Sequence, residues 1–233
     1  MYYFALLLGP ESTDAPDPEA AAAEMAAYEA FHAKAASAIR GGDALTPSST
    51  GVRISGGPDA PIVTDGPFAE GAEVAGGYYV FEAENLDEAL ALARDIPAAK
   101  YGAVEVWPMV HHRPPSKPVG NSWLALLLEP PATAPAPGTP QWDAGIAAHQ
   151  KFGESAGDRT NGGAPLHPPS TATTVRVRDG KVLLTDGPYI EGAEVANGYY
   201  ILDVADRDEA VKIASMIPAT TVEVRQLMGI SGL

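Results

Sequence analysis

Hydrophobic and polar residues follow the same order of patterns twice along this chain. Short apolar runs at residues 2–8 and 123–128, bounded by Gly or Pro, are typical of buried strands. After the first run, Asp17 followed by proline predicts a helix start, and a helical period continues to the glycine pair at 41–42. The corresponding helix of the second half, from Trp142 onward, is predicted to be weaker because glycines interrupt it. The predicted apolar seam of the first helix consists of Met25, Tyr28, His32, Ala35 and Ile39.

A hairpin and a second helix follow in each half. Residues 175–184 carry the strongest local signal, because Asp179-Gly180 between two alternating strands suits a two-residue type I′ turn. The first half has a longer loop here, at 56–61. The remaining expected elements are strands at 77–83 and 198–204, helices that open at Asn85 and Asp206 in a capping-box-like pattern, and last strands around 104–106 and 222–224.

These matching patterns come from an internal duplication. Residues 64–79 and 185–200 are identical at 13 of 16 positions, and the match extends outward through most of both halves. We therefore expect two domains of ordinary small size, 1–113 and 123–233. They are joined by a Pro-rich linker, 114–122, which should be stiff and extended.

The order of elements predicts the fold class. Each copy reads β-α-β-β-β-α-β, which indicates an α+β fold with two helices on one face of one mostly antiparallel sheet, a ferredoxin-like layout. The other face of that sheet would be bare in an isolated copy. Two copies can bury it by packing sheet on sheet. The sequence therefore predicts tandem ferredoxin-like domains that form an intramolecular pseudo-dimeric α/β barrel.

The most specific motifs lie in residues 166–189, which end in Thr-Asp-Gly-Pro-Tyr, and in Gly-Tyr-Tyr at 198–200. They resemble the YCII-related or DGPF-domain family, and the first copy matches through Thr-Asp-Gly-Pro-Phe at 64–68 and Gly-Tyr-Tyr at 77–79. The resemblance covers nearly all of both copies and implies a dimeric α+β barrel, with no assigned activity for most members. Bacterial members are often encoded beside extracytoplasmic-function sigma factors. Some relatives in the wider group look like small-molecule enzymes that use a His–Asp pair.

Composition and charge narrow the function classes. Apolar residues make up 45% of the 233 residues, which is enough for a core, and there is no cysteine for disulfides, thiol chemistry or Cys-based metal sites. The net charge of −15 disfavours binding to nucleic acid and to anionic membranes. No apolar run approaches the roughly 20 residues of a spanning helix, and no signal peptide is recognised, so a cytoplasmic location is expected.

Asp65 and Asp186 are the first candidates for chemistry, because each stands before Gly-Pro at the end of a predicted strand. One interpretation is structural: the carboxylate accepts hydrogen bonds from backbone N–H groups two residues on, in an Asx-type turn. The other is functional: the two carboxylates line matched clefts as general bases or substrate anchors. The structural interpretation is favoured.

Histidine is the natural acid–base partner of such a carboxylate near neutral pH. No histidine occupies an aligned position in both copies, which argues against a symmetric pair of His-dependent sites. If one copy is active, the second is the better candidate, with His149 or His167 beside Asp186. A buried, hydrogen-bonded structural role is the alternative for each. His111 and His112 run into the linker and are expected to be exposed.

Other repeated residues are expected to be structural. Glu-Gly-Ala-Glu recurs at 70–73 and 191–194, and a solvated loop is favoured there over a cation site. In the Tyr-Tyr pairs at 78–79 and 199–200, one ring should face the core side and the other the opposite face. No phosphate-binding loop, nucleophile elbow, zinc motif or dinucleotide fingerprint is recognised, so we expect no cofactor and no metal.

Two hypotheses on function remain open. The first, slightly favoured, is a non-catalytic or regulatory module, linked to a sigma-factor system through the family context. The second is a small-molecule enzyme with Asp186 as base and His149 or His167 as acid–base partner in the barrel cleft. The two copies are expected to pack on each other, and a homo-oligomer or a protein partner is compatible with either hypothesis.

Overall fold

Twelve strands and five α-helices form the fold of the described residues, in nearly the same order in both copies. The computed structural model describes residues 1–11, 17–67, 73–188 and 194–230. The first copy contains β1 (Tyr2–Gly9), α1 (Pro18–Ala35), β2 (Ile39–Ala44), η1 (Ser48–Thr50), β3 (Val52–Ser55), β4 (Ile62–Asp65), β5 (Val74–Glu82), α2 (Leu86–Ala93), α3 (Ala98–Tyr101) and β6 (Ala103–Pro108). The second contains β7 (Trp123–Glu129), α4 (Pro140–Ala156), η2 (Gly157–Arg159), β8 (Thr160–Pro165), η3 (Pro169–Thr171), β9 (Thr173–Arg178), β10 (Lys181–Asp186), β11 (Val195–Leu202), α5 (Arg207–Ala214) and β12 (Thr221–Gln226).

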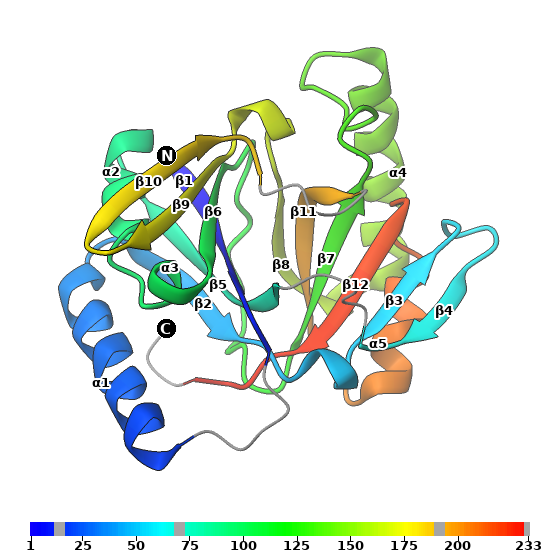
Figure 1. Ribbon diagram of the computed structural model, residues 1–233. Coiled ribbons are helices and arrows are strands. Elements are labelled where there is room, and N and C mark those ends of the chain that lie inside the picture. The colour runs from blue at the N-terminus through cyan, green and yellow to red at the C-terminus, as the bar shows by residue number, and fades with distance from the viewer. Residues whose placement is uncertain (12–16, 68–72, 189–193, 231–233) are drawn as a thin grey trace.

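The two copies exchange their hairpins. One six-stranded sheet has the order β10-β9-β6-β1-β5-β2, and the other has the order β4-β3-β12-β7-β11-β8. Hairpin β9–β10 of the second copy thus pairs with β6 of the first, and β3–β4 of the first pairs with β12 of the second (Figure 1). The α+β class is confirmed and is consistent with tandem ferredoxin-like domains. The assignment of each hairpin to the sheet of its own copy is wrong.

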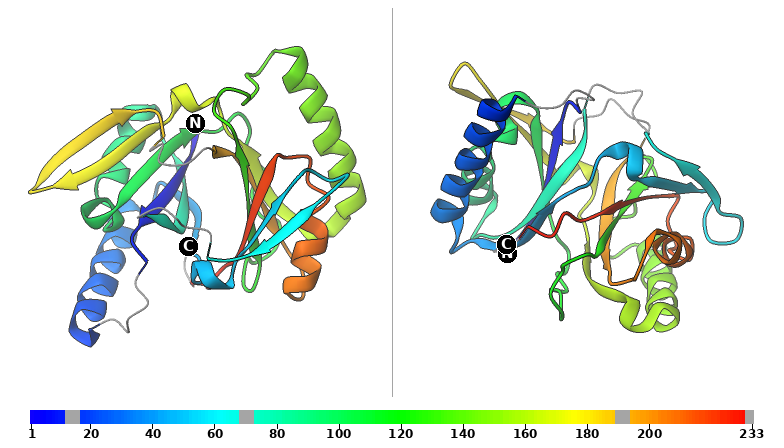
Figure 2. Two further views of the ribbon diagram at one scale, coloured as in Figure 1. Left: turned by 45° about the vertical axis from the view of Figure 1, so that its right-hand side comes forward. Right: turned by 90° about the horizontal axis from the view of Figure 1, so that it is seen from below.

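Each sheet is covered by helices on its outer face and meets the other sheet with its inner face. Helices α1 and α2 cover the first sheet, and α4 and α5 cover the second (Figures 1 and 2). The inner faces share one core that contains Phe4, Trp107, Leu124 and Ile201. One further core lies beneath the helices of each copy. The expected sheet-on-sheet packing of the copies is therefore observed.

After its last strand, each copy reaches across to the other. Beyond β6, Met109 forms a β-bridge with Leu166 at the end of β8. Beyond β12, Leu227 forms a β-bridge with Leu45 at the end of β2. These crossings bridge the chain at the ends of the edge strands β2 and β8, whereas within the described chain no strand or bridge pairs with the outer sides of β4 and β10.

Several local predictions are confirmed. Asp17, Asn85 and Asp206 each accept a hydrogen bond from a backbone N–H in the first turn of α1, α2 and α5. The hairpin turn has φ angles of 51° at Asp179 and 73° at Gly180. A type I′ turn requires positive φ at both central residues, so the turn chemistry alone specifies this hairpin.

The first helix ends earlier than predicted, and an edge strand follows it. Helix α1 stops at Ala35, and Ile39 begins β2. Met25, expected on the buried seam, is 59% exposed. A Cβ at Gly42 would lie 2.7 Å from the ring of Tyr79, so the glycine lets β2 approach β5 closely and does not cap a helix.

The second copy repeats this arrangement. Helix α4 spans 17 residues in spite of its glycines, because Thr139 caps it and its apolar side packs on the sheet. In β8, Gly163 has φ 144°, and a Cβ there would lie 2.4 Å from the carbonyl oxygen of Tyr199. Each copy therefore contains one strand more than predicted, since the glycine pair that resembles a helix end lies within that strand.

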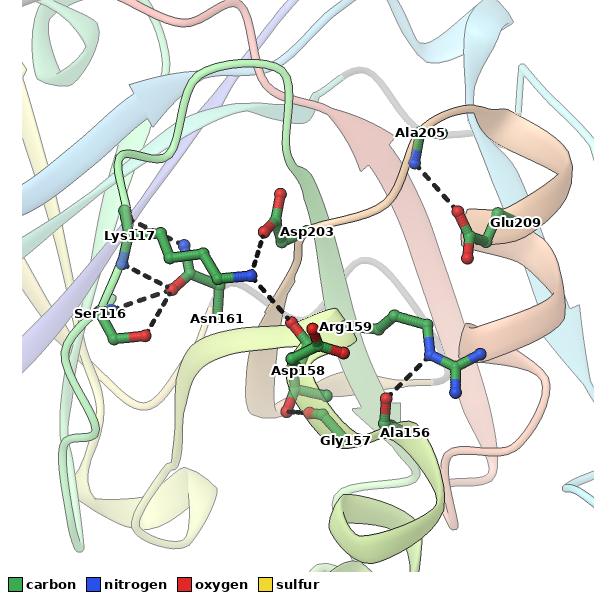
Figure 3. A network of polar contacts seen from close by, with 11 residues as sticks. Ser116, Lys117, Ala156, Gly157, Asp158, Arg159, Asn161, Asp203, Ala205 and Glu209 are labelled. Carbon is green, nitrogen blue, oxygen red and sulfur yellow. Dashed lines mark hydrogen bonds and ion pairs between the residues drawn. The ribbon is translucent and has the colours of Figure 1, made fainter.

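The linker is bound to the second copy. The side-chain Oδ1 of Asn161 accepts hydrogen bonds from the backbone N–H groups of Ser116 (2.9 Å) and Lys117 (3.0 Å), and its side-chain Nδ2 donates to the Lys117 backbone carbonyl at 3.0 Å (Figure 3). The Lys117 ammonium lies 2.8 Å from the carboxylate of Asp203. Because these contacts hold both the backbone and a side chain, this part of the linker belongs to the fold.

Candidate functional site

The Tyr-Tyr pairs divide the two faces of each sheet, as predicted. Tyr78 and Tyr199 belong to the core between the sheets, where their ring centroids are 5.9 Å apart and both rings stack on Phe4. Burial raises the pKa of both phenols well above the ordinary value near 10. Tyr79 and Tyr200 lie on the opposite faces, beneath α1 and α4. The hydroxyl of each outward tyrosine can therefore bond to a side chain of the helix that covers it.

A histidine from the first helix of each copy bonds this outward tyrosine. His32 Nε2 lies 2.7 Å from the Tyr79 hydroxyl, and His149 Nδ1 lies 3.0 Å from the Tyr200 hydroxyl. The alignment of the copies places His149 at Tyr28, four residues before His32. One helical turn separates the two positions, so both face the same side of the helix. Contrary to our expectation, a symmetric pair of His–Tyr contacts forms without a histidine at an aligned position. The four-residue spacing between Tyr28 and His32 was the sequence signal that could have predicted it.

Lowering the pH below about 6.5 is expected to destabilise the fold through these histidines. Burial lowers the pKa of His32 and His149 from the ordinary value of 6.5, against a smaller opposing effect of Glu29 on His32; burial also lowers the pKa of His112. The unfolded chain therefore binds more protons than the folded chain below that pH, and the free energy of unfolding falls as the pH falls. Urea unfolding at pH values on either side of 6.5 measures the loss. His149→Gln should weaken the pH dependence, and an unchanged dependence would contradict this account.

Asp65 ends β4 at the surface and pairs with an arginine of the other copy. Its side chain is 75% exposed and forms an ion pair with Arg207, the first residue of α5. The Asx-type bond from a backbone N–H two residues on cannot form, because that residue is Pro67, which has no N–H. Asp65 is therefore a surface contact between the copies.

Asp186 occupies the matching position at the end of β10. It is exposed, and its carboxylate has no hydrogen-bond or ion-pair partner in the part of the chain that the structure describes. The residue two positions on is again a proline, Pro188. The first-copy counterpart of Arg207 is Leu86, so the cation that pairs with Asp65 has no equivalent here. Asp186 is thus an accessible carboxylate at the rim of the first sheet.

Neither candidate histidine is bonded to Asp186 in the described residues. His149 sits between α4 and β11 on the outer face of the second sheet, whereas Asp186 ends the edge strand of the first. His167 follows β8, and its backbone N–H donates to the Pro108 carbonyl at 3.0 Å. Among the described residues, no hydrogen bond or ion pair joins either imidazole to Asp186. The structure therefore bonds neither histidine to Asp186, and it holds His149 on the other sheet.

Neutralising the two aspartates is expected to cost little stability. Asp65→Asn should lower the free energy of unfolding by less than about 1 kcal/mol, because exposed ion pairs contribute about 0.2–1 kcal/mol. Asp186→Asn is the matched variant and should cause no measurable loss. Thermal and urea unfolding of the single variants measure the change in the free energy of unfolding. A loss of about 1–3 kcal/mol at either site would instead indicate a charged hydrogen bond to the backbone.

A buried ionic cluster, which the sequence analysis did not identify, lies between the sheets. Arg225 is 2% exposed; its Nε donates to the Thr46 carbonyl at 2.9 Å, and its Nη1 lies 3.4 Å from Glu223 Oε1. The other oxygen of Glu223 lies 3.3 Å from Arg53 Nη2. Since Arg53 belongs to β3 and Glu223 to β12, the cluster fastens the exchanged hairpin of the first copy to the second sheet.

Two arginines fasten the other exchanged hairpin to the first sheet. Arg176 forms a bidentate ion pair with Glu73, with both N–O distances at 2.8 Å. Arg178 donates to carbonyl oxygens at the C-terminal end of α3, where cations are favourable. The expectation of a solvated loop is therefore wrong for Glu73, while Glu70 and Glu191 lie outside the described residues.

The remaining surface features carry little chemistry. An open depression of about 470 Å³ lies between the β3–β4 loop and residues 218–220, and the Glu129 carboxylate at its side is bonded to Thr220. In the ranges that the structure describes, no group of three or more His, Asp and Glu residues is placed to hold a metal ion. No helix of the described chain is both long and apolar enough to cross a membrane.

Duplication, two facing antiparallel sheets and exchanged hairpins define a tandem-repeat α+β protein. A family model described as the YCII-related domain matches residues 3–112 and 131–230. The chain therefore belongs to the YCII family and carries two tandem copies of its domain. It is also similar to an uncharacterized protein of Rhizobium meliloti (strain 1021), with 37% identity over 76 residues, which is 32% of this chain and 61% of the relative. The chain thus spans less than two thirds of that relative's length.

Proposed function

We propose that this protein is a non-catalytic module that acts by binding, with a regulatory role. The observation that carries the proposal is the separation of Asp186 from His149. Asp186 ends an edge strand of the first sheet, while His149 is bonded to Tyr200 on the outer face of the second. General acid–base catalysis needs its groups within hydrogen-bond reach of one substrate. Asp186 and His149, held on different sheets, do not meet that condition together.

The regulatory part of the proposal rests on the family resemblance. Bacterial proteins with DGPF-type motifs are often encoded beside extracytoplasmic-function sigma factors, which makes a sigma-factor system the proposed context. Such a role takes place in the cytoplasm. It also requires a protein surface to which a partner can bind, and the open edge of β4 provides a surface of that kind.

We also propose that the strands of the two facing sheets close into a pseudo-dimeric α/β barrel. The bridges of Met109 with Leu166 and of Leu227 with Leu45 support closure, because each connects the end of one sheet to the edge of the other. Backbone hydrogen bonds from Val110 to Pro165 and from Thr46 to Gln226 continue these junctions. A closed barrel would act as a rigid frame for the two exchanged hairpins.

The second candidate function is a small-molecule enzyme with Asp186 as base. It is favoured by one observation: the Asp186 side chain is exposed and without a hydrogen-bond partner in the described residues, so its carboxylate is accessible. Of the two histidines, His167 lies closer along the chain, one short turn before β9.

Affinity purification from the source organism distinguishes the two functions. The tagged parent is compared with a variant that carries Asp65→Asn, Asp186→Asn, His149→Gln and His167→Gln, after unfolding curves have shown that both are folded. We expect both proteins to retain the same protein partner in stoichiometric amount. A partner other than a sigma-factor component would make the sigma-factor context wrong. No partner, together with turnover of a compound in cell extract by the parent and not by the variant, would make the protein an enzyme.

A further inference from the structure

We propose that two copies of this chain associate by antiparallel pairing of their β10 strands across a two-fold axis at Leu183. This inference goes beyond the proposed function and does not depend on it. Strand β10 is the outermost strand of the first sheet, and all six of its residues are exposed. Figures 1 and 2 show the hairpin β9–β10 at the periphery of the molecule.

The centre of β10 is apolar on both faces. Val182, Leu183 and Leu184 are 44%, 48% and 55% exposed. Natural proteins usually protect a sheet edge with charges, proline or a bulge within the edge strand. Here the charges stand only at the two ends, on Lys181 and Asp186. A six-residue edge strand with three apolar residues at its centre is a template for another strand.

The turn fixes which backbone groups of β10 point outward. Arg178 and Lys181 flank the two-residue turn and face each other, so they form a hydrogen-bonded pair. Hydrogen-bonded and non-hydrogen-bonded pairs alternate along an antiparallel ladder. Leu183 therefore bonds to β9, whereas the N–H and C=O groups of Val182 and Leu184 point to the free side.

These outward groups are complementary to themselves about Leu183. A two-fold axis there places Val182 opposite Leu184 of the second copy as a hydrogen-bonded pair on one face of the sheet. Leu183 then meets Leu183 of the second copy on the other face, and Lys181 faces Thr185. An axis at Val182 would place Leu183 opposite Lys181, and an axis at Leu184 would place it opposite Thr185. The axis at Leu183 therefore gives the best apolar pairing.

Continuity and charge indicate a second copy as the occupant. The first sheet already grows by accepting a hairpin from the other copy within the chain, and a further hairpin continues the same contact. Residues 173–186 contain three basic and two acidic residues, a net charge of +1 in a chain of net charge −15. The repulsion between two acidic molecules is therefore smaller at this edge than elsewhere.

The corresponding edge of the other sheet, β4, is less suitable for pairing with a second copy. Strand β4 has four residues, and its apolar exposed side chains are only Ile62 and Val63. Its last residue, Asp65, is engaged by Arg207. Strand β4 therefore offers a matched control for β10.

Sedimentation velocity of the full chain tests the proposal. Between about 5 and 500 µM we expect a reversible monomer–dimer equilibrium with a Kd of roughly tens of micromolar, because a single strand pair buries a small interface. Higher NaCl concentration should tighten the dimer, since it screens the repulsion of two acidic molecules. Leu183→Lys should weaken it at least about tenfold, because two like charges would meet on the axis. Ile62→Lys, at the corresponding position of β4, should leave it unchanged.

Hydrogen exchange gives a second, local readout. The amides of Val182 and Leu184 should become more protected as the concentration rises, whereas the amide of Val63 should not. A chain that stays monomeric over the whole range of protein concentration overturns the proposal, even if another molecule pairs with β10. A dimer that Ile62→Lys weakens as much as Leu183→Lys overturns it as well. Neither result bears on the proposed function, whose test uses different variants.

Discussion

Separating the two copies is expected to abolish the folding of each half as a monomer. Residues 1–120 and 121–233 each lose the hairpin that completes their sheet and one side of the shared core, where Phe4 and Trp107 face Leu124. Each large apolar side chain left in water costs about 1.5–3 kcal/mol, and several of them exceed the roughly 5–15 kcal/mol that stabilises a typical domain. Neither half alone should show a cooperative monomeric unfolding transition. An equimolar mixture should refold to a 1:1 complex that does.

The matched control is the intact chain, cut only after it has folded. A protease site inserted at Gly120–Asn121, both exposed, breaks the linker beyond its bonds to Asn161. The cut protein should remain a 1:1 complex and unfold cooperatively, as followed by sedimentation and by urea unfolding. A half that sediments as a monomer and unfolds cooperatively would contradict the prediction. It would mean that a hairpin can return to the sheet of its own copy.

Local sequence does not determine which sheet each hairpin joins. Strand β9 pairs with residues 104–106 and β3 pairs with residues 222–224, and both of these segments read Val-Glu-Val. The turn and register of each hairpin follow from its own residues, as Asp179-Gly180 shows. The choice between two nearly identical edges depends instead on distant contacts such as the ion pair of Arg176 with Glu73.

The candidate residues could be identified from the sequence one at a time, but their neighbours could not. The alternation of each Tyr-Tyr pair follows from strand geometry and is confirmed. In the Asp-Gly-Pro motif, the sequence alone excludes a hydrogen bond from the backbone N–H two residues on to the aspartate, because that residue is proline. The ion pair of Asp65 with Arg207 joins residues of different copies, so it depends on the exchange of hairpins.

Replacing Arg225 with methionine is expected to cost about 3–5 kcal/mol of stability, the range for removing one partner of a buried ion pair. The guanidinium is almost completely buried and is bonded to the Thr46 carbonyl by both Nε and Nη2. Its loss leaves that carbonyl without this donor and leaves the Glu223 carboxylate with one arginine fewer. Urea unfolding measures the change, and the dependence on urea concentration should keep its slope if the two end states are unaltered.

Two further variants separate lost charge pairing from lost packing. Adding Glu223→Gln to Arg225→Met should recover part of the stability, because the remaining buried group is then neutral. Arg53→Met acts on the same glutamate from a more exposed position and should cost less than Arg225→Met. If the double variant is no more stable than Arg225→Met alone, the loss comes from packing. In the first copy Trp107 follows Val-Glu-Val at the position of Arg225, and its indole N–H donates to the buried Glu105 carboxylate at 3.2 Å, so an aromatic donor takes the place of the guanidinium there.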